Sequence, residues 1–98
     1  MSEHVHLIAR LVPREGREAA LAQAIAEIVP PVREEPGCLI YAAHESRERP
    51  GTIVMIETWE SQAALDAHAA GANFRALAAR FDDLLGEPLA IETLRPIA

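Results

Sequence analysis

The chain has 98 residues, half of them apolar and 24% charged, with a formal net charge of −6. This length and balance are typical of one small globular domain, here residues 1–98, and they exclude a disordered or fibrous chain. All nine Lys or Arg residues are arginines. No cluster of them is long enough to follow a phosphate backbone, so we expect no nucleic-acid partner.

The N-terminal residues 1–4 read Met-Ser-Glu-His, whereas a secretory signal begins with basic residues and continues with an apolar run. No later apolar stretch approaches the ~20 residues that cross a bilayer. We therefore expect a cytoplasmic protein that does not contact a membrane. The single Cys38 cannot form an intramolecular disulfide, and a lone cysteine that begins an apolar run is more often a small core residue than a nucleophile.

The first predicted elements are a strand and an amphipathic helix. Residues 4–12 alternate as a strand does, with one apolar face formed by Val5, Leu7, Ala9 and Leu11. Apolar residues then recur at helical spacing over residues 15–34. Pro30 and Pro31 interrupt this pattern, because a proline ring clashes with the preceding turn and removes a backbone donor. We expect a kink or a fresh short turn there.

The remaining elements are two strands, two helices and a final strand. The apolar runs 38–46 and 52–60 predict neighbouring antiparallel strands. Ser61 is a suitable N-cap for a short helix that ends at Gly71. Another helix begins at Asn73 and carries on one face Phe74, Leu77, Ala78, Phe81, Leu84 and Leu85. Residues 89–95 predict the last strand.

This order, β-α-β-β-α-β, predicts an α+β protein with the ferredoxin-like motif. Right-handed crossovers place both helical layers on one side of a four-stranded antiparallel sheet, so the other face has no cover within the chain. The third strand is nevertheless apolar on both sides, with Ile53 and Met55 on one and Val54 and Ile56 on the other. We therefore expect a homodimer in which two sheets pack face to face.

Two stretches carry a family resemblance. Residues 53–61 (IVMIETWES), followed by residues 64–68 (ALDAH) and Phe74, resemble the strand-helix signature of the antibiotic biosynthesis monooxygenase superfamily. Residues 28–41 (IVPPVREEPGCLIY) resemble the helix-to-strand passage of its quinol monooxygenase-like members. The resemblance implies a dimeric α+β barrel with a pocket between sheet and helices. It also implies oxidation of a small phenolic or quinol compound by dioxygen, without metal, flavin or other cofactor.

Other branches of the superfamily match less well at their functional positions. The haem-degrading branch uses an asparagine on the first strand and a histidine in the last helix, whereas this chain has Ala9 and no histidine there, although Trp59 matches that branch. The asparagine and tyrosine of the polyketide-oxygenating members are replaced by Met55 and Leu65. The resemblance therefore implies the fold more specifically than the reaction.

Cofactor-free oxygenation needs a base in a dry pocket, and His68 is the first candidate for that base. An imidazole titrates near neutrality, and the helix that carries His68 should cover the pocket. As an alternative, His68 is a helix-end residue that bonds a backbone carbonyl near Gly71. Glu57 and Trp59 share a strand face, where the carboxylate could serve as base or acceptor and the indole could stack on a flat substrate. As alternatives to these roles, Glu57 forms an ion pair with an arginine such as Arg10 or Arg75, and Trp59 only closes the core.

Phe74, Phe81 and His44 complete the candidate site. Phe74 and Phe81 either contact a substrate or only fill the core. Tyr41 and His44 lie on opposite faces of the second strand, so only one of them can face a given pocket, and we prefer His44. His4 and His6 share a face, but no other ligand accompanies them at an established metal spacing, so an interface role is the simpler interpretation.

We consider three functions. The leading hypothesis is a cofactor-independent monooxygenase that acts on a small quinol or polyphenol, with His68 as base and Trp59 lining the site. The second is a non-oxidative isomerase or lyase that acts on a small polar metabolite. The third is a non-catalytic dimer that binds a hydrophobic small molecule. The scarcity of polar residues expected on the helix-facing side of the sheet favours an apolar ligand, which weighs against the second.

Overall fold

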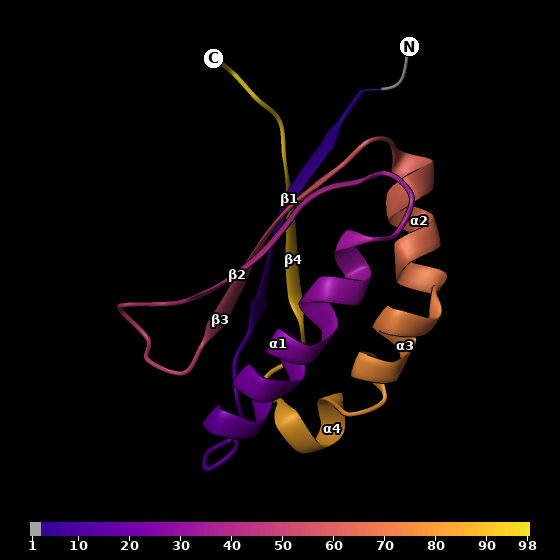
Figure 1. Cartoon of the computed structure of the whole chain (residues 1–98). Coiled ribbons are helices and arrows are strands. Elements are labelled where there is room, and N and C mark those ends of the chain that lie inside the picture. Colours follow the sequence, from indigo (N-terminus) through magenta and orange to yellow (C-terminus); the bar gives the residue numbers. More distant parts are fainter. Residues whose placement is uncertain (1–2) are drawn as a thin grey trace.

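The computed structural model describes residues 3–98. Met1 and Ser2, on which part of the argument against a secretory leader depends, lie outside the described residues. Figure 1 shows the elements in the order β1 (Val5–Leu11), α1 (Glu18–Arg33), β2 (Cys38–Glu45), β3 (Ile53–Trp59), α2 (Gln62–Ala70), α3 (Ala72–Ala78), α4 (Phe81–Leu84) and β4 (Ala90–Leu94).

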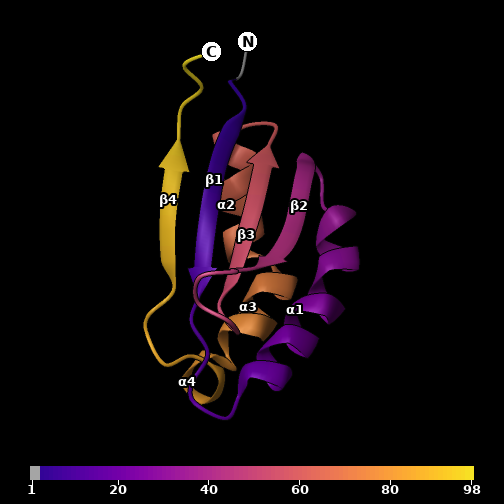
Figure 2. The same ribbon diagram turned by 90° about the vertical axis from the view of Figure 1, so that its left-hand side faces the viewer.

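The four strands form one sheet in the order β2-β3-β1-β4, and every neighbouring pair is antiparallel. This arrangement confirms the predicted α+β, ferredoxin-like fold. All four helices lie on one side of the sheet, which Figure 2 shows with the other face toward the viewer. The space between the sheet and the helices is therefore the only interior that the described residues enclose.

The core fills that space with the residues that the strand pattern predicted. Leu7 and Leu11 of β1 and Met55 of β3 are buried, and they meet Leu21 and Ile25 of α1. Burying one such side chain contributes roughly 1.5–3 kcal/mol to the free energy of unfolding. The packing of Met55 fixes which face of β3 points toward the helices. It thereby fixes the direction of all the remaining side chains on that strand.

The fresh turn predicted at Pro30 and Pro31 is wrong, because α1 continues as one helix through both prolines to Arg33. Two prolines deprive the carbonyls of Ala26 and Glu27, four residues earlier, of their helical donors. Both of these residues and both prolines are exposed, so water can hydrogen-bond to the free carbonyls.

The helices after β3 follow the sequence signals with one difference. The hydroxyl of Ser61 accepts a hydrogen bond from the backbone N–H of Ala64 at 3.2 Å, which confirms the predicted N-cap of α2. The predicted long helix after Gly71 is instead two short ones. The N–H of Arg80 bonds to the carbonyl of Leu77 at 2.9 Å, and this tighter turn ends α3 before α4 begins.

The face of the sheet without helices is apolar, as the pattern of β3 predicted. Ile56 is 43% exposed and Ile40 is 48% exposed on neighbouring strands, and Ile8 and Val54 lie on the same face. We call this surface the open face. A contiguous apolar surface of this kind is unusual for a protein that acts alone.

Gly37 makes the turn from α1 into β2 in the left-handed region, at φ +81°. A Cβ atom added there would lie 2.5 Å from the Cβ atom of Ala64 on α2. The carbonyl of Gly37 also accepts a hydrogen bond from the N–H of Glu60 at 2.8 Å. The turn therefore needs glycine for its backbone angle and for the close approach of α2.

We predict that Gly37→Ala destabilises the protein more than Gly16→Ala does. Gly16 also has a positive φ, of +85°, but no atom lies within 4 Å of a Cβ added there. Both variants should lose roughly 1–2 kcal/mol for the left-handed backbone. Gly37→Ala should lose a further ~1–3 kcal/mol for overpacking against Ala64.

Urea unfolding at one protein concentration measures both losses, and adding Ala64→Gly to Gly37→Ala should recover most of the extra loss. Equal losses in the two single variants would contradict a close contact between this turn and α2.

Candidate active site

A cavity of about 70 Å³ lies between the helix-facing side of the sheet and the helices that follow β3. Three of its lining residues are polar, namely Tyr41, Glu57 and His68. The rest of the lining is apolar and comes from both layers, including Leu7, Met55, Leu65, Phe74, Phe81 and Ile91. A small apolar cavity with a few convergent polar groups is the usual form of a site for a small molecule.

The mouth of the cavity lies beside the edge strand β4. Ile91 of this strand is 58% exposed, and the neighbouring Leu89 and Phe81 are partly exposed. In contrast, Met55 and Glu57 are buried. A ligand would therefore enter past β4 and meet the polar groups at the inner end.

His68 is held by a carboxylate and not by a backbone carbonyl, so the helix-end alternative is wrong. Its side chain is 6% exposed, and Nδ1 lies 2.9 Å from Oε1 of Glu35. Glu35 follows the C-terminus of α1, just before the Gly37 turn. Sequence reasoning missed Glu35, because it is 33 residues away from His68 and only the close approach of that turn to α2 joins them.

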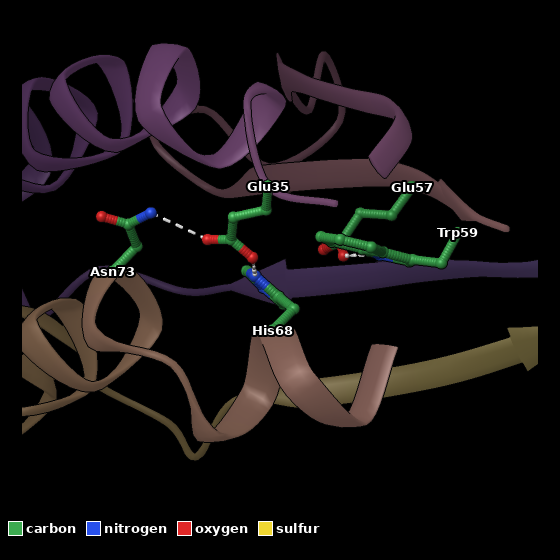
Figure 3. A network of polar contacts seen from close by, with 5 residues as sticks. All are labelled: Glu35, Glu57, Trp59, His68 and Asn73. Atoms are coloured by element: carbon green, nitrogen blue, oxygen red, sulfur yellow. Dashed lines mark hydrogen bonds and ion pairs between the residues drawn. The ribbon is translucent and has the colours of Figure 1, made fainter. Parts of the chain in front are cut away.

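Asn73 completes this network from the first turn of α3. Its amide Nδ2 donates a hydrogen bond to Oε2 of Glu35 at 2.8 Å, as Figure 3 shows. Each oxygen of the Glu35 carboxylate therefore faces one side-chain nitrogen. Because a carboxylate only accepts, we assign the proton of neutral His68 to Nδ1, which leaves Nε2 as a proton acceptor.

Glu57 is a buried carboxyl group without an arginine partner. Its Oε1 accepts a hydrogen bond from Nε1 of Trp59 at 2.9 Å (Figure 3). Arg10, one of the partners considered for it, instead lies 3.9 Å from Glu92. Burial raises the pKa of Glu57, although the Trp59 hydrogen bond and the neighbouring His68 oppose the shift.

Tyr41 lines the cavity and His44 does not, which corrects our preference between them. Tyr41 pairs with Glu57 across β2 and β3, whereas His44 pairs with Val54 and is exposed on the open face. The Tyr41 ring lies 5.6 Å from the His68 ring in an edge-on arrangement. Burial, and then the nearby carboxylates of Glu57 and Glu35, raise the pKa of Tyr41, so its phenol remains a hydrogen-bond donor.

Trp59 lies behind the cavity wall and not on it. Its side chain is fully buried, and its ring stacks on the His68 ring at a centroid distance of 4.5 Å. The indole therefore supports the imidazole and bonds to Glu57, and the expectation that it lines the site is wrong. Phe74 and Phe81 do line the cavity, with Phe74 5.7 Å from the His68 ring and Phe81 6.1 Å from Phe74.

Cys38 lies partly buried against the core, near this polar group. Burial and the carboxylates of Glu35 and Glu57 raise the pKa of its thiol, and the nearby Arg33 opposes the shift. A raised pKa disfavours the thiolate, which is the nucleophilic form. The expected packing role of Cys38 is consistent with these surroundings.

The other histidines lie away from the cavity. His6 is on the open face, where its Nδ1 lies 3.0 Å from Oγ1 of Thr58, and its ring centroid is 6.5 Å from that of His4. Within residues 3–98, no three His, Cys, Asp or Glu side chains are grouped so as to hold a metal ion. Over the same residues, no helix is both long enough and apolar enough to span a bilayer.

The fold and the cavity define a small ferredoxin-like protein with a candidate site between its sheet and its helices. The family model described as antibiotic biosynthesis monooxygenase matches residues 4–80, and the chain belongs to this family. "Putative monooxygenase Rv0793" of Mycobacterium tuberculosis is 33% identical over 97 residues, which are 99% of this chain and 95% of that protein. "Probable quinol monooxygenase YgiN" of Escherichia coli (strain K12) is 42% identical over 73 residues, covering 63% of this chain and 69% of that protein.

Solved structures agree with this assignment. PA3566 from Pseudomonas aeruginosa has a TM-score of 0.91 and 33% sequence identity, over 100% of this chain and 98% of that chain. The structure of Rv0793 has a TM-score of 0.90 and 32% identity, over 98% of this chain and 97% of that chain. The likeness therefore extends through β4, beyond the residues that the family model matches.

We predict that Glu57→Gln removes a pH-dependent cost to stability. A carboxyl whose pKa is raised on folding keeps its proton in the folded protein while the unfolded chain has lost it. The wild-type free energy of unfolding should therefore fall, relative to that of Glu57→Gln, as the pH rises from about 4.5, the ordinary pKa of the group. Urea unfolding at a series of pH values measures this difference, and the new amide can still accept from Trp59.

Glu60→Gln is the matched control, because Glu60 lies just beyond the same strand and is exposed. Its profile should follow that of the wild type. If the free energies of unfolding of Glu57→Gln and the wild type differed by the same amount at every pH, burial would not raise the pKa of Glu57.

Proposed function

We propose that this protein is a cofactor-independent monooxygenase that oxidises a small quinol or polyphenol with dioxygen, and that His68 is the base. The observation that supports this most is His68, which lines a largely apolar cavity while its Nδ1 lies against Glu35, so that Nε2 is left as the acceptor nitrogen. Membership of the monooxygenase family supports the reaction class. The printed name of YgiN supports a quinol as the substrate class.

The proposed chemistry begins when Nε2 removes a proton from a phenolic hydroxyl. The electron-rich phenolate then reduces dioxygen by one electron, and the two radicals recombine on the ring. For a simple quinol, one oxygen atom remains on the product as a hydroxyquinone and the other leaves as water, so the substrate itself supplies the electrons. An apolar cavity suits this sequence because it keeps bulk water away from the reactive intermediates.

The other polar groups would hold the substrate. The phenol of Tyr41 can donate to a substrate oxygen, and the Glu57 carboxyl, with its raised pKa, lies at the same end of the cavity. Phe74 and Phe81 can face the aromatic ring. The cavity volume is about 70 Å³, less than the ~150 Å³ of an engineered cavity that binds benzene. Even a single-ring compound therefore requires the partly exposed Phe81 at the mouth to move.

The apolar lining also supports a second candidate, a non-catalytic protein that binds a hydrophobic small molecule. Only three of the fifteen lining residues are polar. An isomerase or lyase for a polar metabolite needs more hydrogen-bonding groups than this, so we do not propose that class. Oxygen uptake separates the two remaining candidates.

We predict that the purified, chelator-treated protein consumes oxygen with a panel of dihydroxybenzenes, and that His68→Ala lowers the rate by roughly 10²–10⁴-fold, the usual contribution of a general base. An oxygen electrode measures the rate. His44→Ala is the control, because His44 lies on the opposite face of the sheet and should leave the uptake rate unchanged.

Uptake that is unchanged in His68→Ala would exclude His68 as the base. No uptake by the wild-type protein with any member of the panel would favour the binding protein.

We also propose that the protein is a homodimer in which two open faces pack against each other. Ile40, Ile56 and Leu94, each 43–48% exposed, occupy this face. A 98-residue chain gains stability when a second copy covers such a surface. A two-fold interface also closes on itself and leaves no apolar surface for further association.

We predict that Ile56→Glu converts the dimer to a monomer, because each copy would bury a carboxylate in the proposed interface. Light scattering coupled to size-exclusion chromatography measures the mass. Ala22→Glu introduces the same side chain at an exposed position of α1 and should remain dimeric. A wild-type protein with the mass of one chain at micromolar concentration would exclude the homodimer.

A further inference from the structure

His68 separates two hollows in the protein. On one side is the apolar cavity, and on the other is a surface depression between the end of α1 and the α2-α3 junction. Glu35 and Asn73 line the depression and His68 lines both hollows. No other residue in the described part of the chain is shared by their walls. Within the described residues, His68 is therefore the one side chain that lines the cavity and also contacts the outer carboxylate of Glu35.

Exposure to solvent increases from the His68 side chain to the Glu35 side chain. The His68 side chain is 6% exposed and the Glu35 side chain is 18% exposed, and 2.9 Å separates Nδ1 from Oε1. A proton on Nδ1 thus needs to cross one hydrogen bond to reach a group that water can contact. In contrast, His68 itself is buried and also lines the largely apolar cavity.

A buried base that takes a proton from a ligand has to release a proton before it can act again. Glu57 offers no exit, because its Oε1 bonds to the indole N–H of Trp59, which is a donor only and is fully buried. A proton bound there would stay in the core. The bond between His68 and Glu35 is the hydrogen bond from the cavity wall that leads outward.

We propose that Glu35 is a positioning residue that holds His68 in its basic tautomer and passes the proton taken from the substrate to solvent through the outer depression. The inference rests on the proposed function of His68. In the proposed step, Nε2 takes the proton of a ligand hydroxyl and leaves the ligand as an anion. Nδ1 gives its own proton to Oε1 of Glu35, and water in the depression then removes that proton. His68 is then neutral with its proton on Nε2, and the basic tautomer returns when Nε2 gives this proton to the oxygen that leaves as water and Nδ1 regains one from the depression through Glu35.

Asn73 has a defined part in this relay. Its amide donates to Oε2 of Glu35 at 2.8 Å, so the second oxygen is occupied and Oε1 remains for Nδ1 of His68. A donor at Oε2 also stabilises the ionised carboxylate, which is the form that can receive the proton. The pair of contacts thus fixes the orientation of Glu35.

The test uses a nitrophenol, whose anion absorbs visible light and whose neutral form does not. Stopped-flow mixing with the wild-type protein should show formation of the bound anion, and a pH indicator in weak buffer should show an equivalent release of protons. His68→Ala should abolish both signals. Glu35→Gln should slow both by roughly tenfold to 10⁴-fold, the upper value being the loss when the carboxylate of a serine protease triad becomes an amide.

Glu34→Gln is the matched control, because the neighbouring Glu34 is exposed and the substitution changes charge equally. It should behave as the wild type. Glu35→Ala provides a second variant, in which added formate can enter the outer depression and take the place of the lost carboxylate. Formate should restore proton release in proportion to its concentration, which a purely structural role for Glu35 would not produce.

The relay is overturned if Glu35→Gln ionises the probe and releases protons as fast as the wild type, if formate does not rescue Glu35→Ala, or if the wild type leaves the probe neutral. Failure of the proposed oxygenase function looks different. In that case the wild type ionises the nitrophenol and Glu35→Gln is slow, but no dihydroxybenzene supports oxygen uptake.

Discussion

Side chains of β3 point alternately to the two faces of the sheet, and this alternation determines where both the cavity and the open face lie. Met55 and Glu57 point toward the helices, whereas Val54 and Ile56 point away from them. Because the alternation has a period of two, a slip of one residue would exchange the two sets and bring the glutamate to the open face. The packing of Met55 against the core therefore fixes the carboxyl group in the cavity wall.

The polar end of the cavity is stabilised by neighbours that never reach the cavity itself. A buried polar group without a partner costs roughly 1–3 kcal/mol, and here Trp59 donates to Glu57 while Glu35 lies against His68. The indole also stacks on the imidazole, so the two polar residues share one support. Local signals show which residues are polar and inward, but they do not show this second set of contacts.

Much of the fold follows from local patterns, and the errors have identifiable causes. Strand alternation and the Ser61 cap predicted the layers correctly because they depend on neighbouring residues. Pro30 and Pro31 were misinterpreted, since their tolerance depends on which side of α1 faces water. The choice of His44 over Tyr41 failed because it required the register between β2 and β3. Glu35 was missed because only the tertiary approach at the Gly37 turn brings it to His68.

Because Trp59 stacks on His68, the intrinsic tryptophan fluorescence of the protein comes from a ring beside the candidate site. The chain contains a single tryptophan, and its ring centroid is 4.5 Å from that of the imidazole. The natural emission of the protein therefore comes from one ring in contact with a cavity residue. It can follow the titration of a ligand without a dye, a label or a substituted residue.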